Sequence, residues 1–195
     1  NDPQIMIFNL VVIAVIVILL ILANALYVAG EFALVSSRKT RIVQQAEAGN
    51  SLAQRIVPVL EDRNKLDNYI AASQVGITLS SISLGIYGQR ALSPLLDGWL
   101  SRLSLEQVPW LATVLGGGFA ATFVLLLLTT LQVVLGELVP KTLAIQYPER
   151  IAIGTFVPMK ISAEYVLKPL IVVLNGSGRL IMRLLGLDSH GEHAH

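Results

Sequence analysis

The stretch QVPWLATVLGGGFAATFVLLLLTTLQVVLG, residues 107–136, contains no charged residue and is followed directly by ELVPK at 137–141. A helix needs about 20 apolar residues to cross the hydrocarbon core of a bilayer, so this stretch can span a membrane. Pro140 has no N–H and clashes with the carbonyl four residues earlier, so we expect the helix to break and leave the Gly136 carbonyl without its usual partner. Glu137 stands beside that oxygen. A carbonyl and a carboxylate at the end of a membrane span are ligands for a hard cation.

The composition of the chain is typical of a membrane protein. Of its 195 residues, 54% are hydrophobic and only 14% are charged, whereas soluble domains contain about 25% charged residues. The formal net charge of +1 argues against nucleic acid as a partner. The absence of cysteine excludes disulfides, thiolate metal sites and cysteine nucleophiles. The first residues lack the positive flank of a secretory signal, so we expect the first apolar block to be retained as a transmembrane helix.

Two further stretches, 3–30 and 68–89, are also free of charge, although the second contains several serines and threonines. Pro109-Trp110, near the start of the third stretch, is typical of a first helical turn with an interfacial anchor. The sequence therefore predicts an all-α integral membrane protein that lies in a lipid bilayer. Its three transmembrane helices are expected at about residues 4–31, 68–90 and 109–138.

Lysine and arginine residues predict the direction of the spans. Six lie between the first and second spans, two between the second and third, and six after the third. Because cytoplasmic segments are enriched in these residues, we expect a multi-pass protein of the cell membrane with its N-terminus outside and its C-terminus in the cytoplasm. In chain order the basic residues are Arg38, Lys39, Arg41, Arg55, Arg63, Lys65, Arg90, Arg102, Lys141, Arg150, Lys160, Lys168, Arg179 and Arg183.

The remaining segments are expected on the cytoplasmic side. Residues 38–66 have the apolar stripes of short amphipathic helices, with a glycine–asparagine turn between them. Residues 151–187 are apolar, but charges at helical spacing and two prolines interrupt them, which favours a juxtamembrane helix in the interface over a fourth span. We expect one transmembrane domain over residues 1–187 and a flexible tail at 188–195.

Polar residues near the inner end of the first span are candidate cation ligands. Asn24, Tyr27 (or its neighbour Val28) and Glu31 share one helical face. Gly30 weakens the helix, so the backbone carbonyls of Tyr27 and Gly30 can turn toward a site. The first and third spans run in the same direction, which predicts similar depths for their acidic residues. Glu31 is either a ligand or a solvated helix end among the head groups.

The second span runs in the opposite direction and supplies hydroxyl groups. Ser80 and Ser81 lie about 18–20 Å into that span at 1.5 Å per residue, so either serine can meet Asn24 and Glu137. Each of these side chains also has a purely structural interpretation. Asn24 can bond across helices, the serines can bond the carbonyls four residues earlier, and Glu137 can pair with Lys141.

The available ligands favour a hard cation. No cysteine is present, and His190, His193 and His195 lie in the tail rather than in a span, so Zn²⁺ and Cu⁺ lack their preferred ligands. Amide, hydroxyl, carboxylate and backbone oxygens suit Mg²⁺, Ca²⁺ or Na⁺. We expect Mg²⁺, because the fixed carbonyls of a broken helix can compensate for its reluctant dehydration.

The third span has a surface of small residues. Three spans cannot form the inverted repeat of many secondary transporters, so a homodimer would supply the missing symmetry. Gly116-Gly117-Gly118 and Ala120-Ala121 allow close helix contact. Such contact between two copies and contact within one chain are equally compatible with the sequence.

Two classes of function remain, and an enzyme is not expected. The spans contain no Ser/His/Asp set, no paired aspartates and no HExxH motif. The first hypothesis is a Mg²⁺ transporter, because acids inside membranes are costly and normally serve an ion or a proton. The alternative is a structural or regulatory membrane anchor without transport of its own, whose polar residues only hold the helices together.

Three segments resemble the transmembrane domain of the CorC and cyclin M (CNNM) family of magnesium transporters. They are Asn24 through Arg38, QVGITL at 74–79 and GELVPK at 136–141, and in this order they cover most of the chain. The glycine-glutamate-x-x-proline-lysine element is the most specific of the three. The resemblance implies three spans with a cytoplasmic juxtamembrane helix, a homodimer, and export of Mg²⁺ in exchange for Na⁺.

The resemblance also implies a set of ligands. Carried over by position, these are Asn24, Ser80, the Gly136 carbonyl and Glu137, with carbonyls of the Tyr27–Gly30 turn as additions. Members of that family continue into a pair of cystathionine-β-synthase-type domains that bind ATP. These domains are absent from the present sequence, so nucleotide regulation is not expected of these residues.

Overall fold

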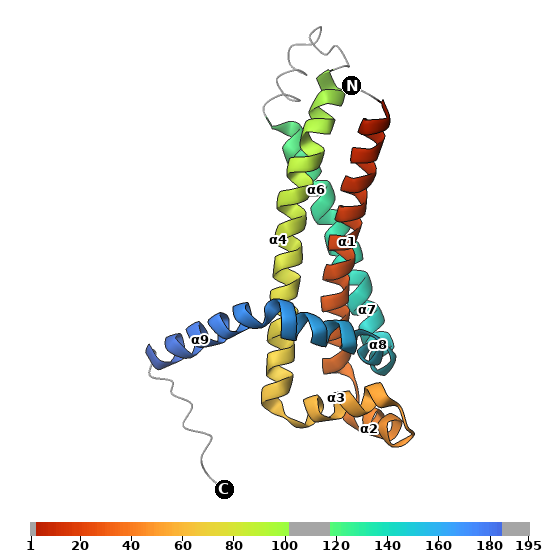
Figure 1. Cartoon of the computed structure of the whole chain (residues 1–195), viewed down its shortest axis with the longest axis vertical. Coiled ribbons are helices and arrows are strands. Elements are labelled where there is room, and N and C mark those ends of the chain that lie inside the picture. The colour runs from red at the N-terminus through yellow and green to blue at the C-terminus, as the bar shows by residue number, and fades with distance from the viewer. Residues whose placement is uncertain (1–2, 102–117, 185–195) are drawn as a thin grey trace.

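The computed structural model describes residues 3–101 and 118–184, and this part of the chain contains helices and no strand. In chain order the helices are α1 (Pro3–Ser36), α2 (Lys39–Glu47), α3 (Ser51–Glu61), α4 (Arg63–Ser101), α6 (Phe119–Leu131), the π-helix η2 (Gln132–Leu138), α7 (Val139–Gln146), α8 (Pro148–Ile161), the π-helix η3 (Ser162–Leu167) and α9 (Lys168–Leu184). The predicted all-α fold is therefore confirmed (Figure 1).

Three helices of the described residues are long and apolar enough to cross a membrane, which confirms the predicted number of spans. All three continue beyond the predicted ends: α1 runs to Ser36, α4 runs from Arg63 to Ser101, and the third helix runs through Pro140 to Gln146. The predicted start of the third span at Pro109-Trp110 lies outside the described residues. The candidate spans are Met6–Ser36, Arg63–Leu100 and Phe119–Gln146.

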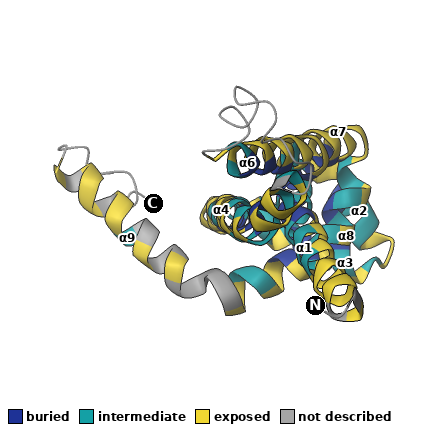
Figure 2. Cartoon of the chain, turned by 90° about the horizontal axis from the view of Figure 1, so that it is seen from above, coloured by how far each residue is buried: buried dark blue, intermediate teal, exposed yellow. Residues whose placement is uncertain are grey.

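The three long helices form a bundle (Figure 1). α6, η2 and α7 follow one another without a break and make up the third helix, which runs parallel to α1 and antiparallel to α4. α1 packs against both α4 and the third helix. Much of the outer surface of the bundle is exposed, as the view from above shows (Figure 2). We call the end of the bundle that carries α2 and α3 the inner end.

The outer surface of the bundle is apolar, as a lipid-facing surface requires. Large apolar side chains on α1, including Ile7 and Phe8, are more than half exposed, and so is Leu126 on α6. A soluble domain rarely exposes so large a continuous apolar surface. The surface chemistry therefore agrees with three helices that lie in a bilayer.

α2 and α3 form a helical hairpin below the bundle. Gly49, with φ of 93°, makes the turn, and a left-handed backbone of this kind favours glycine. Asn50 caps the start of α3, and its side-chain oxygen accepts hydrogen bonds from the backbone N–H groups of Leu52 (3.0 Å) and Ala53 (3.2 Å). Two amphipathic helices in residues 38–66 are therefore present, as the sequence predicts.

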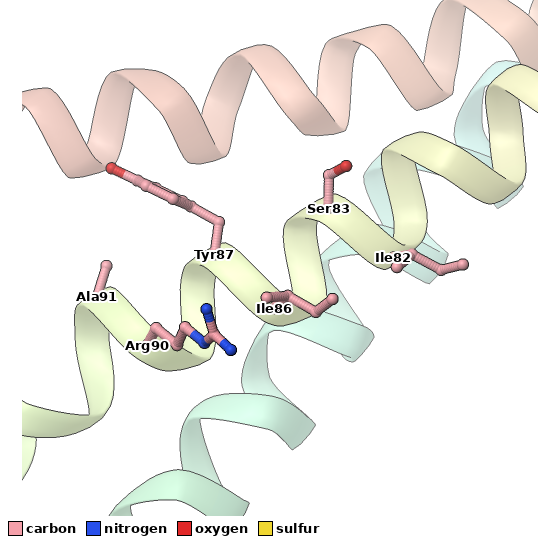
Figure 3. Close-up of a pocket in the computed structure, with 6 residues that line it drawn as sticks. All are labelled: Ile82, Ser83, Ile86, Tyr87, Arg90 and Ala91. Carbon is pink, nitrogen blue, oxygen red and sulfur yellow. The ribbon is translucent and has the colours of Figure 1, made fainter.

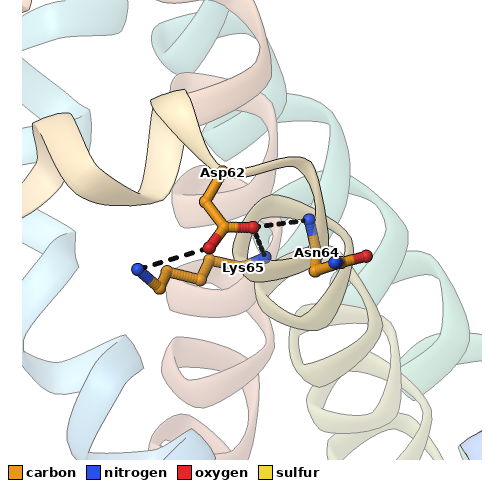
Figure 4. A network of polar contacts seen from close by, with 3 residues as sticks. All are labelled: Asp62, Asn64 and Lys65. Atoms are coloured by element: carbon orange, nitrogen blue, oxygen red, sulfur yellow. Dashed lines mark hydrogen bonds and ion pairs between the residues drawn. The ribbon is translucent and has the colours of Figure 1, made fainter. Parts of the chain in front are cut away.

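Asp62 caps the start of α4 (Figure 4). Its Oδ1 accepts hydrogen bonds from the backbone N–H groups of Asn64 (3.0 Å) and Lys65 (3.3 Å), and its Oδ2 lies 3.3 Å from Lys65 Nζ. The backbone hydrogen bond from Lys65 is the largest cause that holds the pKa of Asp62 below its usual range. A carboxylate here satisfies backbone donors that a helix start leaves without partners.

α8, η3 and α9 follow one another without a break and lie across the inner part of the bundle (Figure 1). We call this segment the belt. Phe156 and Met159 of α8 are buried with Leu34 of α1 and Ile56 of α3 in one apolar core. α9 extends away from the bundle (Figure 2). Within the described residues no fourth span is found, and the belt has the crosswise position expected of a juxtamembrane helix.

Candidate functional site

Asn24 joins all three long helices through its side-chain amide. The residue is fully buried on α1. Its Nδ2 donates a hydrogen bond to the carbonyl oxygen of Gly136 on η2 at 3.1 Å. Its Oδ1 accepts hydrogen bonds from the hydroxyls of Ser80 (2.9 Å) and Ser81 (3.3 Å) on α4. Three of the predicted ligands, Asn24, Ser80 and Gly136, are therefore brought together. We call these residues with Ser81 and Gln132 the polar cluster.

The third helix passes Pro140 without breaking, which differs from the sequence expectation. The chain forms a π-helical turn from Gln132 to Leu138 and returns to α-helix at Val139. Pro140 is one of the first two residues of α7, where a missing N–H is tolerated. A π-turn is wider than an α-turn and is frequent at functional sites. Proline therefore alters the helix without ending it, and the Gly136 carbonyl bonds a side chain of another span.

Gly136 allows α1 and the third helix to approach closely. A Cβ on residue 136 would lie 3.0 Å from Asn24 Nδ2 and 3.5 Å from Asn24 Cβ. The first distance is shorter than nearly all real Cβ contacts, so a side chain here would push the asparagine away. The absence of a side chain at Gly136 thus permits the hydrogen bond between its carbonyl and Asn24.

The two serines of α4 both reach Asn24. Ser80 is buried, and its hydroxyl lies 2.8 Å from the Gly76 carbonyl and 3.0 Å from the Ile77 carbonyl as well as near Asn24. Ser80 therefore bonds the carbonyl four residues earlier and also contacts Asn24, so both interpretations of this serine apply. Ser81 lies further from Asn24 and accepts a hydrogen bond from Gln132 Nε2.

Gln132 is a member of the polar cluster that the sequence reasoning missed. It is half-buried at the start of the π-turn, and its amide joins the third helix to Ser81 on α4. A signal was present, because Gln132 lies four residues before Gly136 and therefore on nearly the same helical face. Its amide adds a polar group beside the two serines.

Glu137 follows Gly136 directly and is half-buried. Among the ion pairs of the described residues, none includes this carboxylate. The possible pair with Lys141 is not formed, because Lys141 Nζ lies 4.4 Å from the centre of the Phe32 ring. The acid beside the polar cluster is therefore not neutralised by a described cation within ion-pair distance.

Tyr27 and Gly30 hold the belt against α1. α1 is an uninterrupted α-helix, so Gly30 does not break it and both carbonyls lie within a continuous helix rather than in an opened turn. The Tyr27 hydroxyl hydrogen-bonds Ser162 of the belt. A Cβ on Gly30 would meet Met159 Cγ at 2.9 Å and the Tyr69 hydroxyl at 3.1 Å, so the belt packs directly on this glycine.

Glu31 lies outside the polar cluster. It is half-buried on α1, with Gln74 of α4 beside its carboxylate. It follows Asn24 by seven residues, which places it about 10 Å further toward the inner end. The structure thus separates the two acids that the sequence expected at similar depths: Glu137 adjoins the cluster and Glu31 lies below it.

The donor set of the cluster is made of neutral oxygens with one adjacent acid. In the described part of the chain no three His, Cys, Asp or Glu side chains gather into a metal site. His190, His193 and His195 lie outside the described residues. An amide, two hydroxyls, a carbonyl and a nearby carboxylate are the oxygen ligands that Mg²⁺, Ca²⁺ and Na⁺ accept.

A hollow of about 480 Å³ lies on α4, further from the inner end of the bundle than the polar cluster (Figure 3). Tyr87 extends toward α1, whereas Arg90 extends away from it. All its lining residues belong to one helix, so the hollow is a groove in the surface of α4 and not a chamber between the spans. The lining residues are Ile82, Ser83, Ile86, Tyr87, Arg90 and Ala91.

The small residues at the start of the third helix differ in their contacts: Gly118 is exposed, and nothing lies within 4 Å of a Cβ added to it. Ala120 is fully buried against the other helices, and Ala121 is half-buried. Gly116 and Gly117 lie outside the described residues. Contact within one chain therefore accounts for Ala120.

The fold and the polar cluster define a class: all-α, multi-pass membrane proteins whose spans meet at a buried polar centre. Sequence comparison gives the family within that class. The family of the cyclin M transmembrane N-terminal domain (CNNM) matches residues 15–195, so the chain belongs to this family.

Several relatives are similar over nearly the whole chain. UPF0053 protein YhdT of Bacillus subtilis (strain 168) is 40% identical over 174 residues, which cover 89% of this chain and 36% of YhdT. Uncharacterized protein MT1889 of Mycobacterium tuberculosis is 37% identical over 175 residues, 90% of this chain and 47% of the relative. A protein named polyamine export protein, from Haemophilus influenzae, is 30% identical over 176 residues, 90% of this chain and 38% of the relative. The chain thus spans less than half the length of these relatives.

Proposed function

We propose that this chain is the membrane-spanning part of a transporter that exports Mg²⁺. The observation that carries the proposal is the meeting of Asn24, Ser80 and the Gly136 carbonyl from three spans, with Glu137 adjacent. An acidic residue within an apolar span is costly and is normally placed for an ion or a proton. The family membership supports a transport function, because one relative carries the name of an export protein.

The hydrogen bonds of the cluster suggest how it takes up a cation. In this structure Asn24 Nδ2 donates to the Gly136 carbonyl, and the serine hydroxyls donate to Asn24 Oδ1. A half-turn of the amide exchanges Nδ2 and Oδ1, so that the amide oxygen and the carbonyl oxygen face the same space. A cation in that space replaces the N–H as partner of the carbonyl. The serine hydroxyls then turn a lone pair toward the cation.

Glu137 supplies the charge in this mechanism. A divalent ion loses much of its hydration on entering a membrane protein, and neutral oxygens compensate only in part. Mg²⁺ takes six oxygens at about 2.0–2.1 Å and usually keeps several waters. The amide, hydroxyl, carbonyl and carboxylate oxygens account for most of that shell, and water completes it.

We extend the proposal to the assembly and its energy source. The transporter lies in the cell membrane with its N-terminus outside and its C-terminus in the cytoplasm, because basic residues concentrate at the inner end. It works as a homodimer and exchanges Mg²⁺ for Na⁺, as the resemblance to magnesium transporters implies. Cystathionine-β-synthase-type domains accompany it in a longer chain, which is consistent with the greater length of the relatives.

Polyamine export is the second candidate, because of the name of the Haemophilus influenzae relative. A polyamine carries several ammonium groups spaced along a chain, and each needs an acceptor or an acid. The described residues contain no cluster of three acidic or metal-ligating side chains, and the polar cluster adjoins only Glu137. A single small cation fits this donor set better than an extended polycation.

Transport from loaded vesicles tests the proposal. Purified protein is reconstituted into liposomes that contain Mg²⁺ and an indicator, with an inward Na⁺ gradient. Wild-type protein is expected to release Mg²⁺, and Glu137→Gln is expected to lose at least tenfold in rate while it folds and dimerises normally. Glu47→Gln is the matched control, because Glu47 is exposed on α2 far from the cluster. Normal transport by Glu137→Gln would overturn the site assignment.

Binding measurements separate the candidates. Calorimetry of the purified chain with Mg²⁺ and with spermidine is expected to give saturable binding for Mg²⁺ that depends on Asn24 and Glu137. Binding of spermidine alone favours polyamine export. Absence of saturable binding for either ligand favours a structural or regulatory anchor.

A further inference from the structure

A second pocket lies at the inner end of the molecule, between α3 and the belt. Its volume is about 250 Å³. Arg55 of α3 lines it from one side, and one face of the belt lines it from the other. The belt residues are Phe156, Val157, Lys160, Ile161, Glu164 and Tyr165. The pocket shares no residue with the polar cluster.

Two cations and one acid line this pocket. Arg55 is exposed and takes part in none of the ion pairs found among the described residues. Lys160 lies 3.7 Å from Glu164, and both side chains are more than half exposed. An exposed pair of this kind contributes little and is easily exchanged for a stronger partner. The pocket therefore offers one guanidinium and one exchangeable ammonium to an anion.

The remaining lining is apolar, and part of it is exposed. Ile161 is 54% exposed and Tyr165 is 79% exposed. Apolar side chains beside cations are typical of a surface at the boundary between lipid tails and head groups. An occupant of this pocket must therefore carry both an anionic group and apolar surface.

The position of the belt places the pocket at a membrane boundary. Ser162, between Ile161 and Glu164, hydrogen-bonds Tyr27 on α1. Tyr27 lies one helical turn from Asn24 and near the inner end of the apolar part of α1, whose first charged residue is Glu31. The belt thus crosses the bundle where the first span leaves the hydrocarbon.

We propose that this pocket binds the head group of an anionic phospholipid. The Arg55 guanidinium binds the lipid phosphate, because its planar fork of N–H donors matches the phosphate oxygens. The Lys160 ammonium turns from Glu164 to the same phosphate. Ile161 and Tyr165 cover the glycerol and the first carbons of the acyl chains. The bound lipid adds a polar link between α3 and the belt beside the apolar core that Ile56 forms with Phe156 and Met159.

Lipid retention tests this inference on the whole purified chain. The protein is exchanged into micelles that contain phosphatidylglycerol or phosphatidylcholine, and native mass spectrometry counts the lipids that remain bound while the unfolding temperature is measured. We expect phosphatidylglycerol to be retained and to raise the unfolding temperature, and phosphatidylcholine to do neither. A basic residue near an anionic lipid contributes about fivefold in affinity. Arg55→Gln and Lys160→Gln should each weaken retention about fivefold, and the double variant more.

Two controls make the result decisive. Arg63→Gln removes an exposed charge at the inner end outside this pocket and should leave retention unchanged. Inorganic phosphate should neither stabilise the protein nor displace the lipid, because it lacks the apolar part. Equal retention of both lipids, equal effects of Arg55→Gln and Arg63→Gln, or an Arg55-dependent stabilisation by phosphate alone would overturn the inference. All variants replace exposed side chains, and circular dichroism checks that each is folded.

Discussion

The aromatic ring of Tyr27 on α1 lies directly against Gly76 on α4. A Cβ on residue 76 would stand 2.5 Å from ring atoms Cδ1 and Cζ of Tyr27, where no real Cβ is found. Asn24 lies one turn before Tyr27, and Ser80 lies one turn after Gly76. Since the Tyr27 hydroxyl also bonds Ser162 of the belt, one side chain connects the packing beside the polar cluster to the belt.

Gly76→Ala should therefore separate the first two spans. The ring is rigid and has little space to move, so we expect the free energy of unfolding to fall by about 1–3 kcal/mol. Gly85→Ala on the same helix is the control, because nothing lies within 4 Å of its added Cβ. Alanine is the better helix former, so the control should gain about 0.5–1 kcal/mol. Thermal unfolding in detergent measures both, and equal effects would contradict the packing described here.

Tyr27→Phe should loosen the belt and leave the bundle intact. The variant keeps the ring against Gly76 and loses only the hydrogen bond to Ser162, at a cost of about 1 kcal/mol. Hydrogen exchange by mass spectrometry should show faster exchange in residues 162–184 and unchanged exchange in α4. Tyr165→Phe changes a side chain that is 79% exposed and should alter neither region. A uniform change along the chain would argue against a local link.

Asn24→Leu should destabilise the bundle. The substitution keeps a similar volume but removes the side-chain donor to the Gly136 carbonyl, whereas the Ser80 hydroxyl keeps the Gly76 carbonyl as an acceptor. Each buried polar group left without a partner costs about 1–3 kcal/mol. Ser83→Ala on α4 replaces an exposed hydroxyl and should cost far less. Chemical or thermal unfolding compares the two, and an Asn24→Leu protein as stable as wild type would contradict the central role of this amide.

Acid should weaken the start of α4 through Asp62. Its pKa is lowered in the folded protein, chiefly by the backbone hydrogen bond from Lys65, so the folded state binds fewer protons than the unfolded state near the unfolded pKa of about 3.9. The stabilisation is therefore present above that pH and is lost as the pH falls through the folded pKa. Asp62→Ser keeps a capping oxygen without titrating. Its unfolding temperature should depend less steeply on pH between 5 and 2 (about the range over which a carboxylate cap titrates), and an unchanged slope would show that other groups control acid unfolding.

The sequence predicted the three spans and the approach of Ser80 or Ser81 to Asn24, whereas the ligand set of Asn24, Ser80 and the Gly136 carbonyl was implied by the family resemblance. Both predictions follow from simple geometry: charge-free stretches set the spans, and a fixed rise per residue sets the depths of polar groups on antiparallel helices. Ser80 and Ser81 could not be separated by depth, because they differ by about 1.5 Å along the axis. The structure shows that both contact Asn24, at different distances.

Side-chain partners were harder to predict than positions. Lys141 lies four residues after Glu137, which favours an ion pair, yet it lies over the Phe32 ring of another helix. The π-turn is the physical reason that local spacing fails here, since it changes which residues of the third helix face one another. Gly30 looked like a weak point of α1, but the belt packs on it through Met159 and supports the helix. Such effects depend on contacts between segments far apart in the chain.

The π-turn also governs the direction in which the third helix faces its neighbours. Residues of the third helix that are buried or half-buried against the bundle form a stripe that repeats at every fourth position from 120 to 144. Four residues of an α-helix turn about 40° more than one full circle, so a stripe with this repeat would wind about 240° around a regular helix over six steps. A π-turn uses more residues for each circle and winds the stripe back. The widened turn therefore sets the angle between the two halves of the helix: α6 packs against α4, whereas η2 and α7 pack against α1. A deletion within the turn would rotate α7 away from α1. The inward positions are Ala120, Val124, Leu128, Gln132, Gly136, Pro140 and Ala144.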